Sequence, residues 1–584
     1  MTESLITQHI DLWTSAIEAK STAGRGSKNK FDLYGIKKLR ELILELAVRG
    51  KLVPQDPTDE PASVLLERIA EEKTKLIKEK IVKKSAGLPE IPDDELPFEL
   101  PAGWAFSRLG NITSRLGSGS TPRGGANVYV EEGVPFLRSQ NIWNEGIRLD
   151  DIAYIPHSIH QNMENTQVQS GDILLNITGA SLGRTTIFPE YLKEANVSQH
   201  VTVIRLINKQ MNHFVHLCMS SPLVQKLVWK RQVGVAIEGL SKKVLELFEF
   251  PIPPLKEQHR IVAKVDELMA LCDQLEQQTL TSIDAHATLV ETLLETLTNS
   301  ADAAELEQNW ARISEHFDTL FITEQSIDAL KQTILQLAVM GKLVRQDPTD
   351  EPASVLLEKI AAEKAQLIKD KKIKKEKPLP PISDDEKPFE LPQGWEWCRL
   401  NSIVHILGDG LHGTPEYSEN GDFFFINGNN LINGLITIKP ETKKVDRIQY
   451  EKYKKNLNER SVLVSINGTL GNIAFYNDEP IILGKSACYF NLSENVYKNF
   501  IKLLVESPIF TMFANLNATG STIKNLGLNA MNNFPIALPP RSEQKAIICK
   551  VHTLIDLCER LKSEMQQQRQ LKLILANEFV AKVI

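Results

Sequence analysis

The sequence predicts an α+β fold class in which two mixed α/β domains of about 150 residues each are separated by long coiled-coil helices. Three observations predict it: a long internal repeat, apolar residues at steps of four and three inside the repeated segments, and short β-branched and aromatic runs between them. The 584 residues fit about three or four units of roughly 100–200 residues each. A composition of 42% hydrophobic and 24% charged residues argues against a mostly disordered chain.

The repeat sets the domain organisation. Residues 36–84 and 327–375 align without a gap and are identical at 34 of 49 positions. At the same offset of 291 residues, PFELPAGW at 97–104 matches PFELPQGW at 388–395. Because self-similarity at a fixed offset marks a duplicated architecture, these segments predict two similar structural frames.

A second pair of matching segments closes each frame. Residues 250–275 and 534–561 share a double proline, a Glu-Gln pair and a cysteine. The apolar steps of four and three predict a coiled-coil helix in each copy. The seam residues are Ile261, Val265, Leu268, Cys272 and Leu275 in the first copy, and Ile547, Val551, Leu554, Cys558 and Leu561 in the second.

The first of these helices is predicted to be long. Residues 255–298 contain no proline or glycine, and the apolar spacing continues through Leu289, Leu293 and Leu297 to a turn at Asn299 and Ser300. At about 1.5 Å per residue, this helix would measure about 65 Å.

Shorter helices are predicted to end at Gly50 and Gly341, which suit helix C-caps. A charged helix follows in each copy, and the lysines within 73–84 and 364–377 predict a solvated face. Pro- and acid-rich linkers then lead to Trp104 and Trp395, which we interpret as packing anchors. The predicted organisation is a helical region with its linker (1–97), a first insert domain (98–253), a central helical region with its linker (254–388), a second insert domain (389–540) and a C-terminal helical region (541–584).

The two insert domains differ strongly in sequence. Runs such as HVTVIRLI at 200–207 and SVLVSI at 461–466, separated by Gly, Asn and Ser clusters, predict strands and turns. Only short islands match between the inserts. They are Thr121-Pro122 with Thr414-Pro415, FLRSQNI (136–142) with FINGNNL (425–431), and LLNITGASLGR (174–184) with LVSINGTLGN (463–472).

The order of these features, present twice, resembles the DNA-specificity subunit of type I restriction–modification enzymes over nearly the whole chain, and most of all its larger type IB members. The resemblance implies a non-catalytic subunit in which each of two target-recognition domains reads one half of a split double-stranded DNA site. It also implies that the helices fix the spacing and dock two DNA-adenine methyltransferase subunits, which carry S-adenosylmethionine. Restriction subunits with translocase and nuclease activity would complete the complex.

The physical properties of the chain fit this resemblance. Two long helices with apolar seams can pack antiparallel as a rigid spacer. The first frame is split between 1–97 and 541–584, whereas the second, 254–388, is continuous. If the terminal helices pair as the central ones do, the molecule gains a pseudo-twofold axis and two similar docking surfaces.

Base reading needs fixed donors and acceptors, such as Arg for guanine and Asn or Gln for adenine. Glycine-rich loops with small hydroxyl residues and exposed lysines suit phosphate contacts. In the first domain the candidate DNA-binding residues are Thr121, Arg123, Arg138, Ser139, Gln140, Asn141, Asn176, Thr178, Ser181, Arg184, Lys242 and Lys243. In the second domain they are Thr414, Asn427, Asn429, Asn430, Asn467, Thr469, Asn472 and Lys524. Polar turns, ordinary hairpins and solvated lysines are the alternative interpretations.

Enzymatic motifs are missing from the sequence. No Asn-Pro-Pro-aromatic motif of adenine methyltransferases and no H-E-x-x-H occurs, and Glu479 stands where a phosphate loop ending in Gly484-Lys485-Ser486 would need glycine. We therefore predict no catalytic residue, no cofactor and no metal site. The six scattered cysteines, the lack of an apolar stretch of about 18 residues and the acidic N-terminal segment predict a cytoplasmic protein with no membrane partner.

The net charge of −7 argues against DNA binding when taken alone. Within 98–253, however, 14 Lys and Arg face 13 Asp and Glu, and within 389–540 the numbers are 13 and 14. The acidic excess therefore belongs to the helical frames. A non-enzymatic helical adaptor with two protein- or glycan-binding modules stays open as an alternative, and a self-contained DNA-modifying enzyme is a weaker third.

Overall fold

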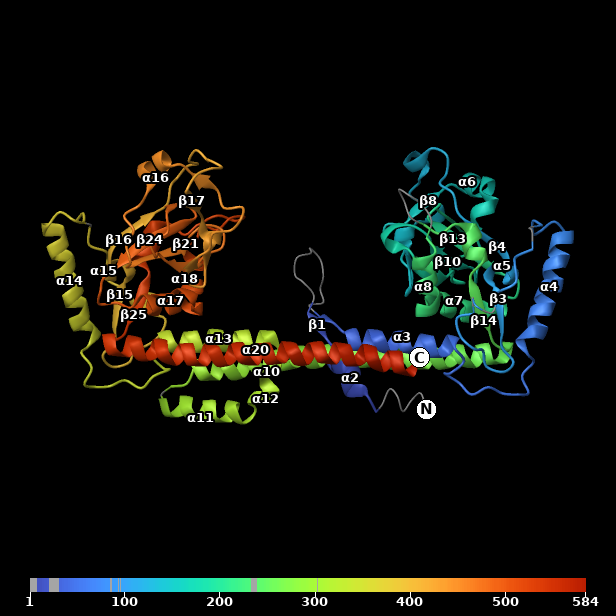
Figure 1. Ribbon diagram of the computed structural model, residues 1–584, viewed down its shortest axis with the longest axis horizontal. Helices are drawn as coiled ribbons and strands as arrows, with labels where there is room; N and C mark the ends of the chain where they lie inside the picture. Colours follow the sequence, from blue (N-terminus) through green and yellow to red (C-terminus); the bar gives the residue numbers. More distant parts are fainter. Residues whose placement is uncertain are drawn as a thin grey trace. The chain divides into compact units, whose positions relative to one another are not determined.

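The computed structural model describes residues 8–19, 31–84, 87–92, 94, 96–232, 239–301, 303–375 and 377–584. The chain divides into two units, Met1–Thr281 with Gln568–Ile584, and Ser282–Gln567. Each unit holds one mixed α/β domain beside a group of helices (Figure 1). Two long helices, α10 (Leu255–Thr298) and α20 (Arg541–Val583), run from one unit into the other.

The helical part of the first unit is built around α3. Its apolar residues Ile36, Leu39, Ile43 and Leu46 are buried at steps of three and four, which places them on one helix face. Nearby, Arg40 Nη2 donates hydrogen bonds to Asp273 (2.7 Å) and Glu276 (3.0 Å) on α10. The short elements of this part are α2 (Ile10–Ser15), α3 (Tyr34–Val48), α4 (Ala62–Lys78), β1 (Glu18–Ala19) and β2 (Phe31–Asp32).

The domain of the first unit contains two four-stranded sheets, of order β11-β10-β13-β4 and β8-β5-β12-β9, with the pairs β14-β3 and β6-β7. The pair β5–β12 is parallel, and the other pairings are antiparallel. The strands are β3 (Ala105–Arg108), β4 (Thr113–Ser118), β5 (Val134–Leu137), β6 (Ile142–Trp143), β7 (Gly146–Ile147), β8 (Ala153–Ile155), β9 (Gln167–Val168), β10 (Ile173–Asn176), β11 (Thr185–Ile187), β12 (Ala195–Val197), β13 (Val201–Leu206) and β14 (Glu249–Ile252). The helices are α5 (Leu109–Ile112), α6 (His157–Asn162), α7 (Asn212–Ser220), α8 (Pro222–Lys230) and α9 (Lys242–Glu246).

The domain of the second unit repeats this topology, with sheets of order β16-β24-β21-β22 and β20-β17-β23 and the pairs β15-β25 and β18-β19. Again the second sheet contains one parallel pair, β17–β23. The strands are β15 (Glu396–Arg399), β16 (Val404–Asp409), β17 (Phe423–Ile426), β18 (Leu431–Ile432), β19 (Leu435–Ile436), β20 (Lys444–Val445), β21 (Ser461–Ser465), β22 (Ile473–Phe475), β23 (Ile481–Leu483), β24 (Ala487–Leu492) and β25 (Pro535–Leu538). The helices of this domain are α15 (Leu400–Ile403), α16 (Arg447–Tyr453), α17 (Lys498–Glu506), α18 (Pro508–Asn517) and α19 (Leu528–Asn533). The helical part of the second unit contains α11 (Ala303–Glu315), α12 (Phe317–Leu320), α13 (Glu324–Val339) and α14 (Ala353–Lys369). The predicted class, mixed α/β domains joined by long helices, is confirmed.

The predicted helical seams are largely confirmed. Ile261, Val265, Leu268 and Cys272 are buried on α10, and Ile547, Val551 and Cys558 are buried on α20. The predicted continuation toward the end of α10 is wrong by one residue, because Leu289 is 50% exposed whereas Val290 and Leu294 are buried with Leu297. Val290 lies 18 residues after Cys272, which is five turns of an α-helix, whereas a strict heptad count drifts off that face.

The two predicted glycine caps are confirmed. Gly50 has φ +68° and Gly341 has φ +73°, a left-handed conformation that costs glycine little. Each glycine also lies so close to a proline and a tryptophan ring that a Cβ would overlap them, with Pro101 and Trp104 in one copy and Pro392 and Trp395 in the other. Both tryptophans are buried, which confirms them as packing anchors.

The predicted solvated face of the charged helices needs one correction. Lys73 donates from Nζ to the carbonyl of Gly110, and Lys364 Nζ donates to the carbonyl of Asn401 at 3.0 Å. Burial lowers the pKa of Lys73, since a charged amine is less stable away from water. These two equivalent lysines therefore attach α4 and α14 to the adjoining domains.

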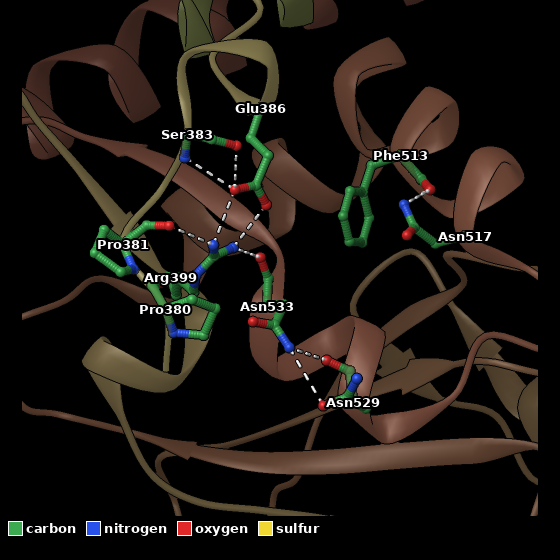
Figure 2. A network of polar contacts seen from close by, with 9 residues as sticks. All are labelled: Pro380, Pro381, Ser383, Glu386, Arg399, Phe513, Asn517, Asn529 and Asn533. Carbon is green, nitrogen blue, oxygen red and sulfur yellow. Dashed lines mark hydrogen bonds and ion pairs between the residues drawn. The ribbon is translucent and has the colours of Figure 1, made fainter. Parts of the chain in front are cut away.

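An arginine at the end of β15 fixes the Pro- and acid-rich linker of the second unit (Figure 2). Arg399 donates from Nη1 to Glu386 Oε1 (2.9 Å), from Nε to the carbonyl of Pro380 (2.9 Å) and from Nη2 to that of Pro381 (3.1 Å). Arg108 bonds the carbonyls of Pro89 and Glu90 in the same way. Arg108 also pairs with Glu249 of β14, and in both units an arginine at the end of a strand binds the carbonyls of the linker.

Candidate nucleic-acid interface

Most candidate residues of the first domain lie at one edge of its sheets. Ser118 and Leu175 both pair with Thr202, and Leu175 also pairs with Thr185. Strands β4 and β10 therefore end beside the first residues of β13 and β11. The parallel strands β5 and β12 end at the same place, where Ser198 N donates to Leu137 O at 2.9 Å. The sheet topology therefore brings together the loops at 119–123, 138–141 and 177–184.

A chain of polar contacts joins two of these loops. Thr121 Oγ1 donates to Gln199 Oε1 at 3.2 Å, Gln199 Nε2 lies 3.5 Å from His200 Nε2, and His200 Nδ1 lies 2.7 Å from Thr178 Oγ1. Gln199 and His200 are not among the predicted residues. Their position at the start of the strand run at 200–207 is the signal that could have found them.

The predicted base-reading run at 138–141 is held partly by Asp151. Arg138 Nη2 donates to the Asp151 carbonyl, and Gln140 Nε2 donates to its Oδ2, both at 2.6 Å. Gln140 and Asp151 are exposed and Arg138 is half-buried. Asp151 Oδ2 also lies 3.6 Å from Arg138 Nη2, so the carboxylate forms an ion pair with the arginine.

Three predicted asparagines are buried and used by the fold. Asn141 is 0% exposed, and its side chain accepts from Arg138 N and donates to Arg148 O, each at 3.0 Å. Asn430 holds the equivalent turn, accepting from Asn427 N at 2.9 Å and donating to Thr437 O at 3.0 Å. Asn176 donates to Ser139 O at 2.8 Å and is also fully buried.

The candidates of the second domain gather at the equivalent edge. Ser486 Oγ donates to Asn427 Oδ1 at 2.9 Å, and Asn472 Nδ2 donates to Gly428 O at 3.1 Å. Asn429, Thr469 and Thr414 are exposed there. The sequence presents Ser486 only as part of an incomplete phosphate loop, whereas the structure places it beside Asn427.

The predicted lysines lie next to the glycine-rich loops. Leu240 N donates to Ile177 O at 3.0 Å, and Gly468 N donates to Lys524 O at 2.8 Å. Lys242 pairs with Glu246 at 3.3 Å, and Lys524 Nζ donates to Asn515 Oδ1 at 2.5 Å. Lys243 and Arg123 are exposed, and Ser181 is half-buried.

A hairpin beside this edge was not predicted. In the first domain β6–β7 carries Trp143, whose ring centroid lies 3.5 Å from Arg148 Cζ and 3.8 Å from Arg184 Cζ. In the second domain the equivalent hairpin, β18–β19, exposes Ile432 and Leu435, and the exposed fraction of Leu435 is 70%. The two domains thus differ in chemistry at one shared position.

No metal site or membrane-spanning helix is found among the described residues. The cysteines are free thiols, and those other than Cys549 are buried. Burial raises the pKa of Cys398 and Cys488 to about 12 each and that of Cys272 to about 11, so these thiols stay protonated and unreactive at neutral pH.

Comparison with known proteins decides the family. The model of the type I restriction modification DNA specificity domain matches residues 101–285 and again 392–571. The chain belongs to this family. It is 42% identical to the EcoEI specificity subunit of Escherichia coli and 42% identical to the EcoAI specificity subunit, in both cases over 98% of each chain. The protein is therefore a type I DNA-specificity subunit with two recognition domains, and the adaptor alternative finds no support in these matches.

Two solved structures match at lower sequence identity. The HsdS subunit of Thermoanaerobacter tengcongensis is 17% identical with a TM-score of 0.40, covering 82% of this chain and 98% of that one. A chain from a study of the assembly of a type I R-M system is 17% identical with a TM-score of 0.46, and the match covers 83% of this chain and 98% of that one.

Proposed function

We propose that each recognition domain reads one half of a split DNA site and that the subunit performs no catalysis itself. The observation that carries this proposal is the common edge of the sheets. Both domains bring the same loops together there, while the side chains on those loops differ: Arg138 and Gln140 in one, Asn427 and Asn429 in the other. Different side chains on one scaffold suit two different base sequences.

The proposed contact residues are the candidates whose side chains reach the surface. Arg138, Gln140, Asn427 and Asn429 would read bases, and the hydroxyls and cations of the neighbouring loops would contact phosphates. Asn141, Asn176 and Asn430 support these loops from beneath, because their side chains are already hydrogen-bonded inside the domain.

The helical frames would hold the two domains in inverted orientation about a pseudo-twofold axis and fix the distance between half-sites. We propose domain limits of 98–253 and 389–540, with the remaining segments forming the frames. The frames would dock two DNA-adenine methyltransferase subunits, and restriction subunits would complete a complex that acts in the cytoplasm. The near-identical repeats support two copies of one partner.

A methylome comparison tests the function. Cells with the gene should show one split adenine-methylation motif that disappears when the gene is deleted, and persistence of every motif would refute the proposal.

The charge balance adds a second test. Because both recognition domains are close to neutral, the chain alone should bind DNA weakly, and tight, strongly salt-dependent binding without the methyltransferase would contradict this expectation.

A further inference from the structure

Three side chains of the first domain form a stack beside the proposed reading edge. The guanidinium carbons of Arg148 and Arg184 lie 3.5 Å and 3.8 Å from the centroid of the Trp143 ring. Two guanidinium groups this close to one centroid would overlap on a single face, so they cover opposite faces of the ring. We call these three residues the arginine clamp.

The ring of Trp143 is fixed by its hairpin. Its Nε1 donates to Gln140 O at 2.7 Å, and Trp143 pairs with Gly146 across the β6–β7 hairpin. Asn144 Oδ1 accepts from Thr185 N at 3.0 Å and ties the hairpin to β11. Because both faces and the N–H group are already engaged, Trp143 offers no surface to a base and acts as a positioning residue.

The two guanidinium groups keep most of their hydrogen-bonding capacity. Glu145 forms an ion pair with Arg148 Nη2 at 4.0 Å, a separation beyond hydrogen-bond distance. Among the described residues, no acceptor is found for the Arg184 side chain. Two like charges held on one ring repel each other, and an anion bound to each guanidinium group relieves that repulsion. The planar fork of arginine donors matches the oxygens of a phosphate.

We propose that Arg148 and Arg184, held by Trp143, bind backbone phosphates of the DNA at the half-site read by the first domain. This inference rests on the proposed function and names the residues that would contact backbone phosphates at one half-site. The second domain carries Ile432 and Leu435 on the equivalent hairpin, so the clamp acts on one half-site only.

The test measures DNA binding by the complex of this subunit with its methyltransferase over a range of salt concentrations. Arg148→Gln and Arg184→Gln should each weaken binding evenly across sequences and reduce the slope of log K against log salt by about 0.9 for each phosphate that is no longer neutralised. The matched control is Arg68→Gln on α4. The Arg68 side chain is 55% exposed against 52% for Arg148, and its removal should leave the slope unchanged.

Two further variants separate positioning from charge. Trp143→Ala keeps both charges and removes the ring, so affinity should fall, whereas Trp143→Phe keeps a ring and should retain most of the binding.

A neutral methylphosphonate at the contacted phosphate should weaken the wild-type complex and leave the Arg148→Gln complex unaffected. An unchanged salt slope in both arginine variants, or relaxed selectivity at one base pair with an unchanged slope, would overturn the clamp. Absence of specific binding by the wild-type complex would instead overturn the proposed function.

Discussion

The indole nitrogen of Trp395 donates a 2.9 Å hydrogen bond to Glu543 Oε2, linking the entrance of the second recognition domain to the start of α20. The other oxygen of Glu543 accepts from Gln346 Nε2 at 3.0 Å, and the same nitrogen lies 2.7 Å from the carbonyl of Gly341. The first copy repeats part of this junction, where Gln55 Nε2 lies 3.2 Å from Glu257 and 2.6 Å from the Gly50 carbonyl. The repeated residues are therefore those that join helix, loop and domain.

Replacing Glu543 with alanine should destabilise the second unit. The change leaves the buried N–H of Trp395 without an acceptor, which costs about 1–3 kcal/mol, while Gln346 keeps the Gly341 carbonyl as its acceptor. Urea unfolding of the full chain measures the loss. Glu543→Gln should cost less, because the amide oxygen still accepts one bond, and Glu257→Ala gives the matched change in the first unit. Equal stability of Glu543→Ala and wild type would refute the role of this junction.

The Arg399 contact predicts a pH dependence. Hydrogen bonds from Arg399 lower the pKa of Glu386 to about 2 from its ordinary value of 4.5. A carboxyl group with a lowered pKa stabilises the folded state above pH 4.5, and this stabilisation is lost as the pH falls toward 2. The difference in urea midpoint between wild type and Glu386→Gln should therefore shrink on going from pH 6 to pH 3. A difference that stays constant over this range would contradict the assignment.

The turn at 138–141 predicts opposite effects for neighbouring residues. Asn141→Ala should lower stability by about 2 kcal/mol, because it leaves Arg138 N and Arg148 O without their partner. Gln140→Ala should leave the melting temperature nearly unchanged, since the side chain is exposed, and should weaken sequence-specific binding by the complex. Thermal melting and electrophoretic shift assays measure the two effects. A strong loss of stability in Gln140→Ala would refute this division of roles.

Exchange of one recognition domain should change half of the target. Replacing residues 389–540 with the corresponding segment of another specificity subunit should alter only one half of the methylation motif and keep its spacing, because the frames are untouched. Single-molecule sequencing of methylated DNA detects both features. A change in both halves, or in the spacing, would contradict independent reading by the two domains.

The sequence predicted the frames well because their signals are local and repeated. The positions of Gly50 and Gly341, the buried seam from Ile261 to Cys272 and the division into helical and mixed segments all follow from residue type and spacing. Further along α10 the heptad spacing fails, since Leu289 is 50% exposed and Val290 is buried. A heptad count has no information on how far a real helix turns over many residues.

The candidate site was predicted less completely. Asn141 and Gln140 are both polar residues in one short turn, and only the folded backbone decides that the first points inward and the second outward. The stack of Trp143 with Arg184 joins residues 41 positions apart, so no local pattern contains it. Lys73 has the pattern of a solvated lysine, and only tertiary packing places the Gly110 carbonyl beside it.

Periodicity and turn chemistry depend on neighbouring residues, so the sequence alone predicts the duplicated organisation, the helix seams, the glycine caps and the candidate DNA-contact loops. The tertiary structure alone decided which of those side chains are available. Strand register brought β4, β5, β10 and β12 to a common edge. Burial then used the side-chain N–H groups of Asn141, Asn176 and Asn430 for the fold, because each donates to a backbone carbonyl inside its domain.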